Sequence, residues 1–117
     1  FKNFEIILCE DDEHSETVAI VKEFLLAHPE VKLKHFTQKN IGFRKCRILN
    51  QGIVQATGQI LIFLDGDCVV HPKFIEDHVF QYQTGFYLAG RRIDLEKELT
   101  QNLSTDSVKS GFFDGPN

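Results

Sequence analysis

The sequence predicts an α/β fold with a Rossmann-like, mainly parallel sheet and flanking helices. Short apolar runs typical of strands alternate with amphipathic segments typical of helices, as in parallel α/β sheets. The run at residues 60–64 is entirely apolar, which is expected of a strand buried on both faces. At 117 residues the chain has the length of one domain. We therefore expect a single domain over residues 1–117.

Each expected element follows from a local signal. Apolar residues predict a strand at 4–9, and Ser15 is expected to cap a helix over 16–27 that His28 and Pro29 end. A second helix is expected at 44–57, with Ile48, Leu49, Ile53 and Ala56 facing inward and Gly58 as its C-terminal cap. The remaining expected elements are short strands at 31–36, 59–64 and 86–89, a helix from Pro72 to residue 82 and a short helix at 103–109.

Composition and charge narrow the classes of function. Hydrophobic content of 42% with 26% charged residues is ordinary for a globular chain. The net charge of −4 and the scattered basic residues argue against a nucleic-acid partner. Three distant cysteines form neither a disulfide framework nor a zinc-ligand pattern, and no segment is long and apolar enough to cross a membrane. We expect a cytoplasmic chain and leave open, for the full-length protein, the cytoplasmic face of the membrane and homo-oligomer formation.

Two carboxylates mark the end of the apolar run. Asp65 and Asp67 stand on either side of Gly66, directly after the predicted strand. Ligands of open α/β folds bind at the carboxyl ends of strands, and carboxylate oxygens are hard ligands that suit Mg²⁺ or Mn²⁺. Such an ion could hold a diphosphate. An Asp-Gly turn after a strand accounts for the same residues without a metal, so the neighbouring residues have to decide.

A second acidic cluster, which contains Glu10 and Asp11, follows the first predicted strand. In a right-handed β-α-β arrangement both clusters would lie at one edge of the sheet. The second predicted helix opens with Arg44, Lys45 and Arg47. A helix N-terminus favours anions and added cations would help to hold phosphate, although a solvated helix face is the commoner role of surface lysine and arginine. Together these residues suggest a site for a nucleoside diphosphate.

Other candidate residues have plainer explanations. His71 follows the carboxylate pair and could approach a metal, but His-Pro is also a common helix entry. The cysteines are more readily explained as packing residues, and no serine or cysteine has an evident base partner. Neither a Walker pattern nor a G-x-G-x-x-G loop is present.

These residues resemble the pattern of a family 2 glycosyltransferase of the GT-A type. In that family a Lys and an Asn-x-Gly-Ile helix lead through a Gly to an apolar strand and a D-x-D motif, and residues 45–67 are similar over their whole length. The end of the first strand also resembles the family's acidic pair. The family usually has Asp-Asp-Gly-Ser there, whereas this chain has Glu10, Asp11, Asp12 and Glu13, so Asp11 keeps its place while the loop differs.

The resemblance implies a role for each matching residue. Asp11, beside Glu10, would contact uracil or another base, and Lys45 would lie near the nucleotide. Asp65 would face the ribose or the sugar, and Asp67 would be the main ligand of Mg²⁺ or Mn²⁺ on the diphosphate. The implied donor is a nucleoside-diphosphate sugar, most readily a UDP-sugar, and the implied acceptor is a hydroxyl group of a sugar or another molecule. The implied reaction is an inverting, hexosyltransferase-type transfer of the kind used in polysaccharide biosynthesis.

The resemblance also suggests that the chain is a fragment of a GT-A domain, truncated at both ends. The family's first strand and helix are expected before Phe1, and its acceptor region, with an Asp or Glu as general base, after Asn117. Asp94, Glu96 and Glu98 sit in no motif typical of that base. The catalytic base is therefore left unassigned, and we expect the isolated chain to transfer or hydrolyse little sugar.

Three other interpretations fit parts of the sequence. A phosphoacceptor receiver domain would use Asp65 as the phosphorylated residue and Lys109 as the late lysine, but the interval before Asp65 is too long and no convincing strand precedes Lys109. A haloacid-dehalogenase-type phosphatase would explain the D-x-D-x-V pattern from Asp65 to Val69, without its later motifs. A non-catalytic sugar-nucleotide-binding module stays open.

Overall fold

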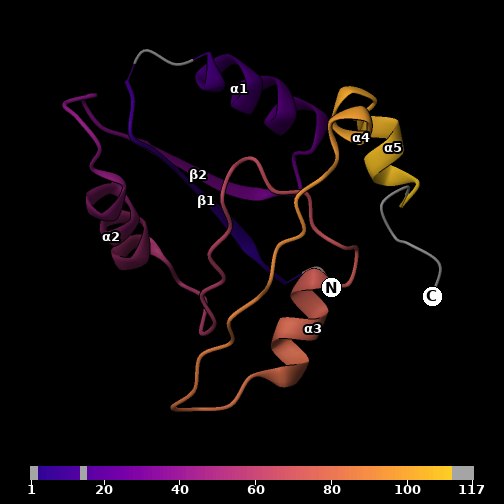
Figure 1. The fold of residues 1–117 in the computed structure, drawn as a ribbon. Coiled ribbons are helices and arrows are strands. Elements are labelled where there is room, and N and C mark those ends of the chain that lie inside the picture. The colour runs from indigo at the N-terminus through magenta and orange to yellow at the C-terminus, as the bar shows by residue number, and fades with distance from the viewer. Residues whose placement is uncertain (1–2, 14–15, 112–117) are drawn as a thin grey trace. The chain divides into compact units, whose positions relative to one another are not determined.

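A computed structural model describes residues 3–13 and 16–111 of the chain. Two compact units are distinguished, residues 2–61 and residues 62–117, and each is described by itself. The described elements are β1 (Glu5–Glu10), α1 (Thr17–Ala27), β2 (Lys32–Thr37) and α2 (Lys45–Gln55) in the first unit, and α3 (Phe74–Gln81), α4 (Lys97–Gln101) and α5 (Thr105–Lys109) in the second (Figure 1).

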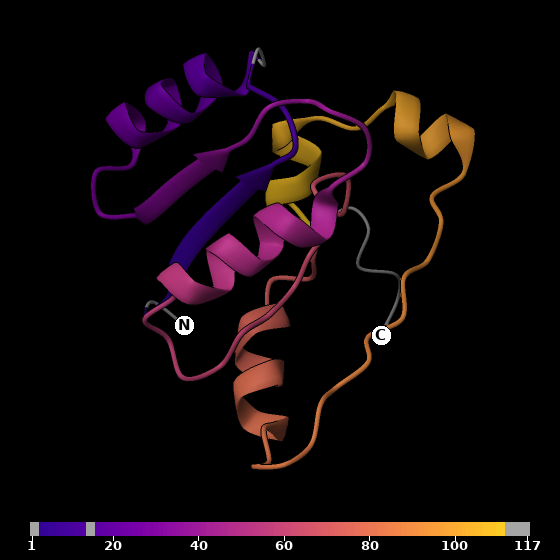
Figure 2. The ribbon, with the colours of Figure 1, turned by 90° about the vertical axis from the view of Figure 1, so that its left-hand side faces the viewer.

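The first unit is built on a parallel pair of strands. β1 and β2 are aligned from Glu5 opposite Lys32 to Glu10 opposite Thr37. Side chains alternate between the two faces along each strand, so Glu5 and Cys9 share one face while Glu10 lies on the other. The helices α1 and α2 lie on opposite sides of the strands (Figures 1 and 2). The α/β fold class with parallel pairing is therefore confirmed.

The backbone of α2 comes close to β1 at Gly52. Ile48, which is only 1% exposed, and Gly52 are the buried residues of this helix. A Cβ atom added to Gly52 would stand 2.5 Å from Sγ of Cys9 and 3.3 Å from a methyl carbon of Ile7. The sequence pattern placed Ile53 inward, but its side chain is 40% exposed. The residue that lets the helix approach the sheet is thus a glycine.

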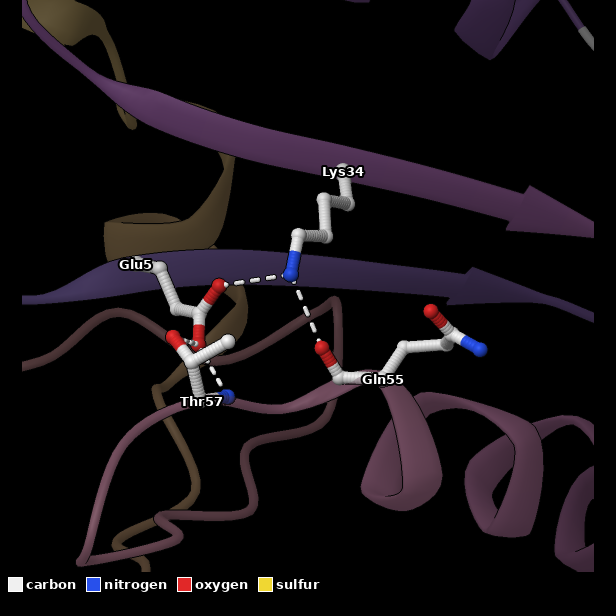
Figure 3. Close-up of polar contacts among 4 residues, drawn as sticks. All are labelled: Glu5, Lys34, Gln55 and Thr57. Carbon is white, nitrogen blue, oxygen red and sulfur yellow. Dashed lines mark hydrogen bonds and ion pairs between the residues drawn. The ribbon is translucent and has the colours of Figure 1, made fainter.

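A polar cluster joins the start of β1 to the end of α2 (Figure 3). Oε1 of Glu5 accepts hydrogen bonds from the backbone N–H and the hydroxyl of Thr57, both at 2.6 Å. Its Oε2 lies 3.0 Å from Nζ of Lys34, which also donates to the carbonyl of Gln55 at 2.8 Å. The Thr57 hydrogen bonds, followed by the hydrogen bond and charge of Lys34, lower the pKa of Glu5 to about 2 although desolvation opposes them.

Two expected strands are absent from the described part of the chain. Residues 59–64 and 86–89 form no strand, and β1 and β2 pair only with each other among the described residues. The apolar run is also not buried as expected, since Leu61 is 45% and Phe63 is 60% exposed. The prediction of these strands was wrong because apolar composition indicates burial, whereas a strand also requires a backbone hydrogen-bonding partner.

The helix boundaries differ from the predicted ones by small amounts. The predicted cap Ser15 lies outside the described residues, and Glu16 precedes α1 without a side-chain capping bond. Ala56 rather than Gly58 is the C-terminal cap of α2. The short helix α4 was not predicted, while α5 falls within the expected range and starts with a capping box between Ser104 and Ser107. None of the helices in the described part of the chain is long and apolar enough to traverse a bilayer.

Candidate functional site

The carboxyl ends of β1 and β2 meet the start of α2 at Asp11. Asp11 and Gln38 come one step after Glu10 and Thr37, the last aligned pair of the two strands. Gln38 donates from Nε2 to Oδ1 of Asp11 at 2.7 Å and to the carbonyl of Arg44 at 3.1 Å. The backbone N–H of Arg44 donates to Oδ2 of Asp11 at 2.5 Å. One carboxylate thus connects three segments of the chain.

These donors favour the ionised form of Asp11. The backbone hydrogen bond from Arg44 is the largest cause that lowers the pKa of Asp11 below its ordinary value of 3.8, and desolvation opposes it. The hydrogen bond from Gln38 and the charge of Arg44 lower the pKa further. A helix N-terminus attracts an anion. Here the anion is the Asp11 carboxylate, which accepts a hydrogen bond from the backbone N–H of Arg44 at the start of α2.

The basic residues at the start of α2 lie where the sequence predicts them. Lys45 is the first residue of the helix, Arg44 precedes it, and Arg47 follows within the first turn. The side chain of Lys45 is exposed. The guanidinium of Arg44 donates to the carbonyl of Lys39, and its Nε atom is buried without a hydrogen-bond partner in the part of the chain that the structure describes.

Glu10 lies on the opposite face of β1 from Asp11. Its Oε1 accepts from the hydroxyl of Thr17 at 2.9 Å, and its Oε2 lies 2.9 Å from Nε2 of His35. The side chains of Glu10 and His35 are only 20% and 12% exposed. Glu10 therefore links the strands to α1, and of the predicted acidic pair it is Asp11 that reaches the start of α2.

In the second unit, Asp65 and Asp67 belong to a tight turn. The N–H of Cys68 donates to the carbonyl of Asp65 at 3.1 Å, and both carboxylates are exposed. A Cβ atom at Gly66 would have no atom within 4 Å, and Gly66 has no positive φ. The turn therefore does not require glycine, and a side-chain atom at residue 66 would meet no neighbour. The Asp-Gly turn is confirmed, while the metal site stays a prediction.

The other metal candidate, His71, serves as a helix entry. Its Nδ1 accepts from the backbone N–H of Lys73 at 3.1 Å, and its carbonyl accepts from Phe74 at 2.8 Å, at the start of α3. Within residues 3–13 and 16–111, no group of three or more His, Cys, Asp or Glu side chains could hold a metal by itself.

The structure presents the predicted site in two parts. Asp11 and Lys45 lie at the strand ends and helix start of the first unit, and Asp65 and Asp67 lie in a turn of the second. Gln38 is the residue that sequence reasoning missed. The signal that could have found it is its position, because it follows β2 as Asp11 follows β1, at the same edge of a parallel pair.

Comparison with known proteins identifies the class to which this fold and these residues belong. The family model described as "Glycosyl transferase family 2" matches residues 1–113. The chain therefore belongs to glycosyltransferase family 2, which decides against the receiver and phosphatase interpretations. It is 32% identical over 97% of its length to an uncharacterised glycosyltransferase of Rickettsia conorii, of which the alignment covers 18%.

Relatives from other organisms carry similar names. The chain is 30% identical over 78% of its length to glycosyltransferase AglE of Haloferax volcanii, covering 29% of that protein. It is 38% identical over 62% of its length to the uncharacterised glycosyltransferase YibD of Escherichia coli, covering 20% of it. The chain thus spans less than a third of the length of these relatives. No solved structure matches it significantly.

Proposed function

We propose that this chain carries the donor-binding part of a metal-dependent, inverting glycosyltransferase that uses a nucleoside-diphosphate sugar, most readily a UDP-sugar. The observation that carries the proposal is the Asp11 carboxylate, fixed by Gln38 and Arg44 at the carboxyl end of a parallel strand in a family 2 chain. Ligands of α/β folds bind at this edge. A carboxylate held in one orientation suits the N–H groups of a nucleobase, and Lys45 at the adjacent helix start suits the negative charge of the nucleotide.

The exposed carboxylates of Asp65 and Asp67 fit a divalent cation. Mg²⁺ is commonly held by one or two carboxylates together with substrate phosphates and water, so a cage of three protein ligands is not needed. In the proposed arrangement Asp67 is the main protein ligand and Asp65 faces the ribose or the sugar. When bound, Mg²⁺ or Mn²⁺ supplies positive charge that stabilises the departing nucleoside diphosphate.

The proposed reaction is attack of an acceptor hydroxyl on the anomeric carbon of the donor sugar, with inversion and with the help of a general base. In this proposal the residues of the chain bind and orient the donor, and the base is not assigned to any of them. The proposed setting is cytoplasmic polysaccharide biosynthesis with hexosyl transfer to a sugar or another hydroxyl compound.

A thermal-shift titration tests the proposal. The melting temperature of the chain is measured with UDP in the presence and absence of Mn²⁺, and we expect UDP to stabilise the chain only when Mn²⁺ is present. Asp67→Ala should abolish this stabilisation. Asp94→Ala is the matched control, because Asp94 is a 90% exposed carboxylate in the same unit. If UDP with Mn²⁺ did not stabilise the wild type, or stabilised Asp67→Ala equally, the proposed donor site would be contradicted.

A further inference from the structure

Gln38 has a side-chain orientation that its partners determine. Its Nε2 atom faces a carboxylate oxygen of Asp11 and the carbonyl oxygen of Arg44, which are both acceptors. If the amide were rotated, three oxygen atoms would face one another, so the N–H groups must point to Asp11 and Arg44. The amide of Gln38 is half-buried and its two N–H groups are both committed.

The two donors that meet Asp11 restrict the carboxylate at both of its oxygens. Gln38 holds Oδ1 and the backbone of Arg44 holds Oδ2. Gln38 also donates to the carbonyl of Arg44, the residue before α2. Arg44 is therefore hydrogen-bonded to both Gln38 and Asp11. The Gln38 amide therefore contacts the charged group of Asp11 and the backbone carbonyl of Arg44.

We propose that Gln38 is a positioning residue for nucleotide binding, which acts by fixing the plane of the Asp11 carboxylate at the start of α2. This inference rests on the proposed donor site. It predicts that nucleotide affinity depends on a hydrogen-bond donor at residue 38, even though Gln38 need not touch the nucleotide.

Substitution by glutamate gives a test with its own rescue. In Gln38→Glu a second carboxylate replaces the donor and faces both Asp11 and the Arg44 carbonyl, so affinity for UDP with Mn²⁺ at pH 7.5 should fall at least tenfold. Two adjacent carboxylates share a proton readily, and the introduced side chain, once protonated, again donates to Asp11. Lowering the pH to about 5.5 should therefore recover affinity in Gln38→Glu relative to the wild type.

Gln51→Glu is the matched control, since Gln51 is exposed on α2 and the substitution adds the same charge. Calorimetric titrations of the wild type, Gln38→Glu and Gln51→Glu at both pH values give the comparison. Equal affinity of Gln38→Glu and the wild type at pH 7.5, or a loss that is the same at both pH values, would overturn the proposal.

A second measurement separates this inference from the proposed function. The carboxyl titration of Asp11 is followed by NMR in the free chain and in Gln38→Ala, without nucleotide. We expect its pKa to rise in the variant because one donor is lost. If the pKa rises but the wild type binds no UDP, the donor-site proposal fails while the structural relationship holds. An unchanged pKa would show that Gln38 does not position Asp11.

Discussion

Gly52 of α2 lies so close to β1 that a Cβ atom at this position would stand 2.5 Å from Sγ of Cys9. A Cβ atom does not approach another heavy atom to this distance, so Gly52→Ala must displace the Cys9 side chain, the strand or the helix. We expect it to lower the free energy of unfolding by about 1–3 kcal/mol, the usual cost of overpacking. Urea denaturation measures the change.

The control for this substitution is Gly66→Ala. A Cβ atom at Gly66 meets nothing within 4 Å and the backbone there has no positive φ. Its unfolding free energy should stay within about 0.5 kcal/mol of the wild type, as for most surface substitutions. Equal effects of the two alanines would contradict the close approach of α2 to β1.

Glu5 should make the stability of the chain depend on acidity. Its pKa is about 2 in the folded chain and near the ordinary 4.5 when unfolded, so the unfolded state binds the proton more readily. The stabilisation is complete above about pH 5 and is lost as the pH falls towards 2. In Glu5→Gln the unfolding free energy should decrease less over this window. If the unfolding free energies of the wild type and Glu5→Gln fell equally with pH, Glu5 would not contribute to the pH dependence of stability.

Two of the three free cysteines, Cys9 and Cys46, should differ in reactivity towards alkylation. Cys46 is exposed, whereas Cys9 is partly buried against α2 and desolvation raises the pKa of its thiol, an effect that the backbone N–H of Gly52 partly offsets. At pH 8 we expect iodoacetamide to modify Cys46 well before Cys9, as followed by peptide mass spectrometry. Denaturation in urea should remove the difference. If iodoacetamide modified Cys9 faster than Cys46 in the folded chain, the prediction would be wrong.

Gly42, in the loop between β2 and α2, has a φ of 69°. A Cβ atom there would meet no neighbour, so the cost of a side chain is purely conformational. We expect Gly42→Ala to destabilise the chain by about 1 kcal/mol and Gly42→Asn by less, because asparagine tolerates this region better. Thermal unfolding of both variants distinguishes them. Equal stability of the two would indicate that backbone conformation is not the cause.

The elements that the sequence predicts well are those with a strong local period. β1, α1, β2, α2 and α3 all lie within about two residues of their expected bounds, because amphipathic spacing and Pro or Gly signals determine them locally. The run at 60–64 was misjudged because its partner is a property of the whole sheet. Apolar residues alone do not provide a neighbouring strand with which to pair.

The polar contacts were harder to foresee. Asp11 could be placed from its position after a strand, but the partner that orients it, Gln38, is a single loop residue without a periodic pattern. Gly52 belongs to the Asn-x-Gly-Ile pattern, but its packing role was not predicted for a related reason, since a glycine contributes to packing through the absence of a side chain. Both effects depend on contacts between segments distant in sequence, which local patterns do not report.

Two carboxylates, one at the start of β1 and one directly after its end, also impose a length on α2. Glu5 bonds to Thr57 just after the end of the helix, and Asp11 bonds to Arg44 just before its start, so strand and helix run in opposite directions between two fixed points. Eleven helical residues rise ~16 Å and six strand residues extend over ~20 Å, and the bonded residues Arg44 and Thr57 lie just beyond the two helix ends. A one-residue deletion within α2 would shorten the helix by ~1.5 Å and rotate one end by ~100°, so only one of the two ends could stay attached. The spacing between residues 44 and 57 is therefore as much a requirement of this unit as the identity of either acid.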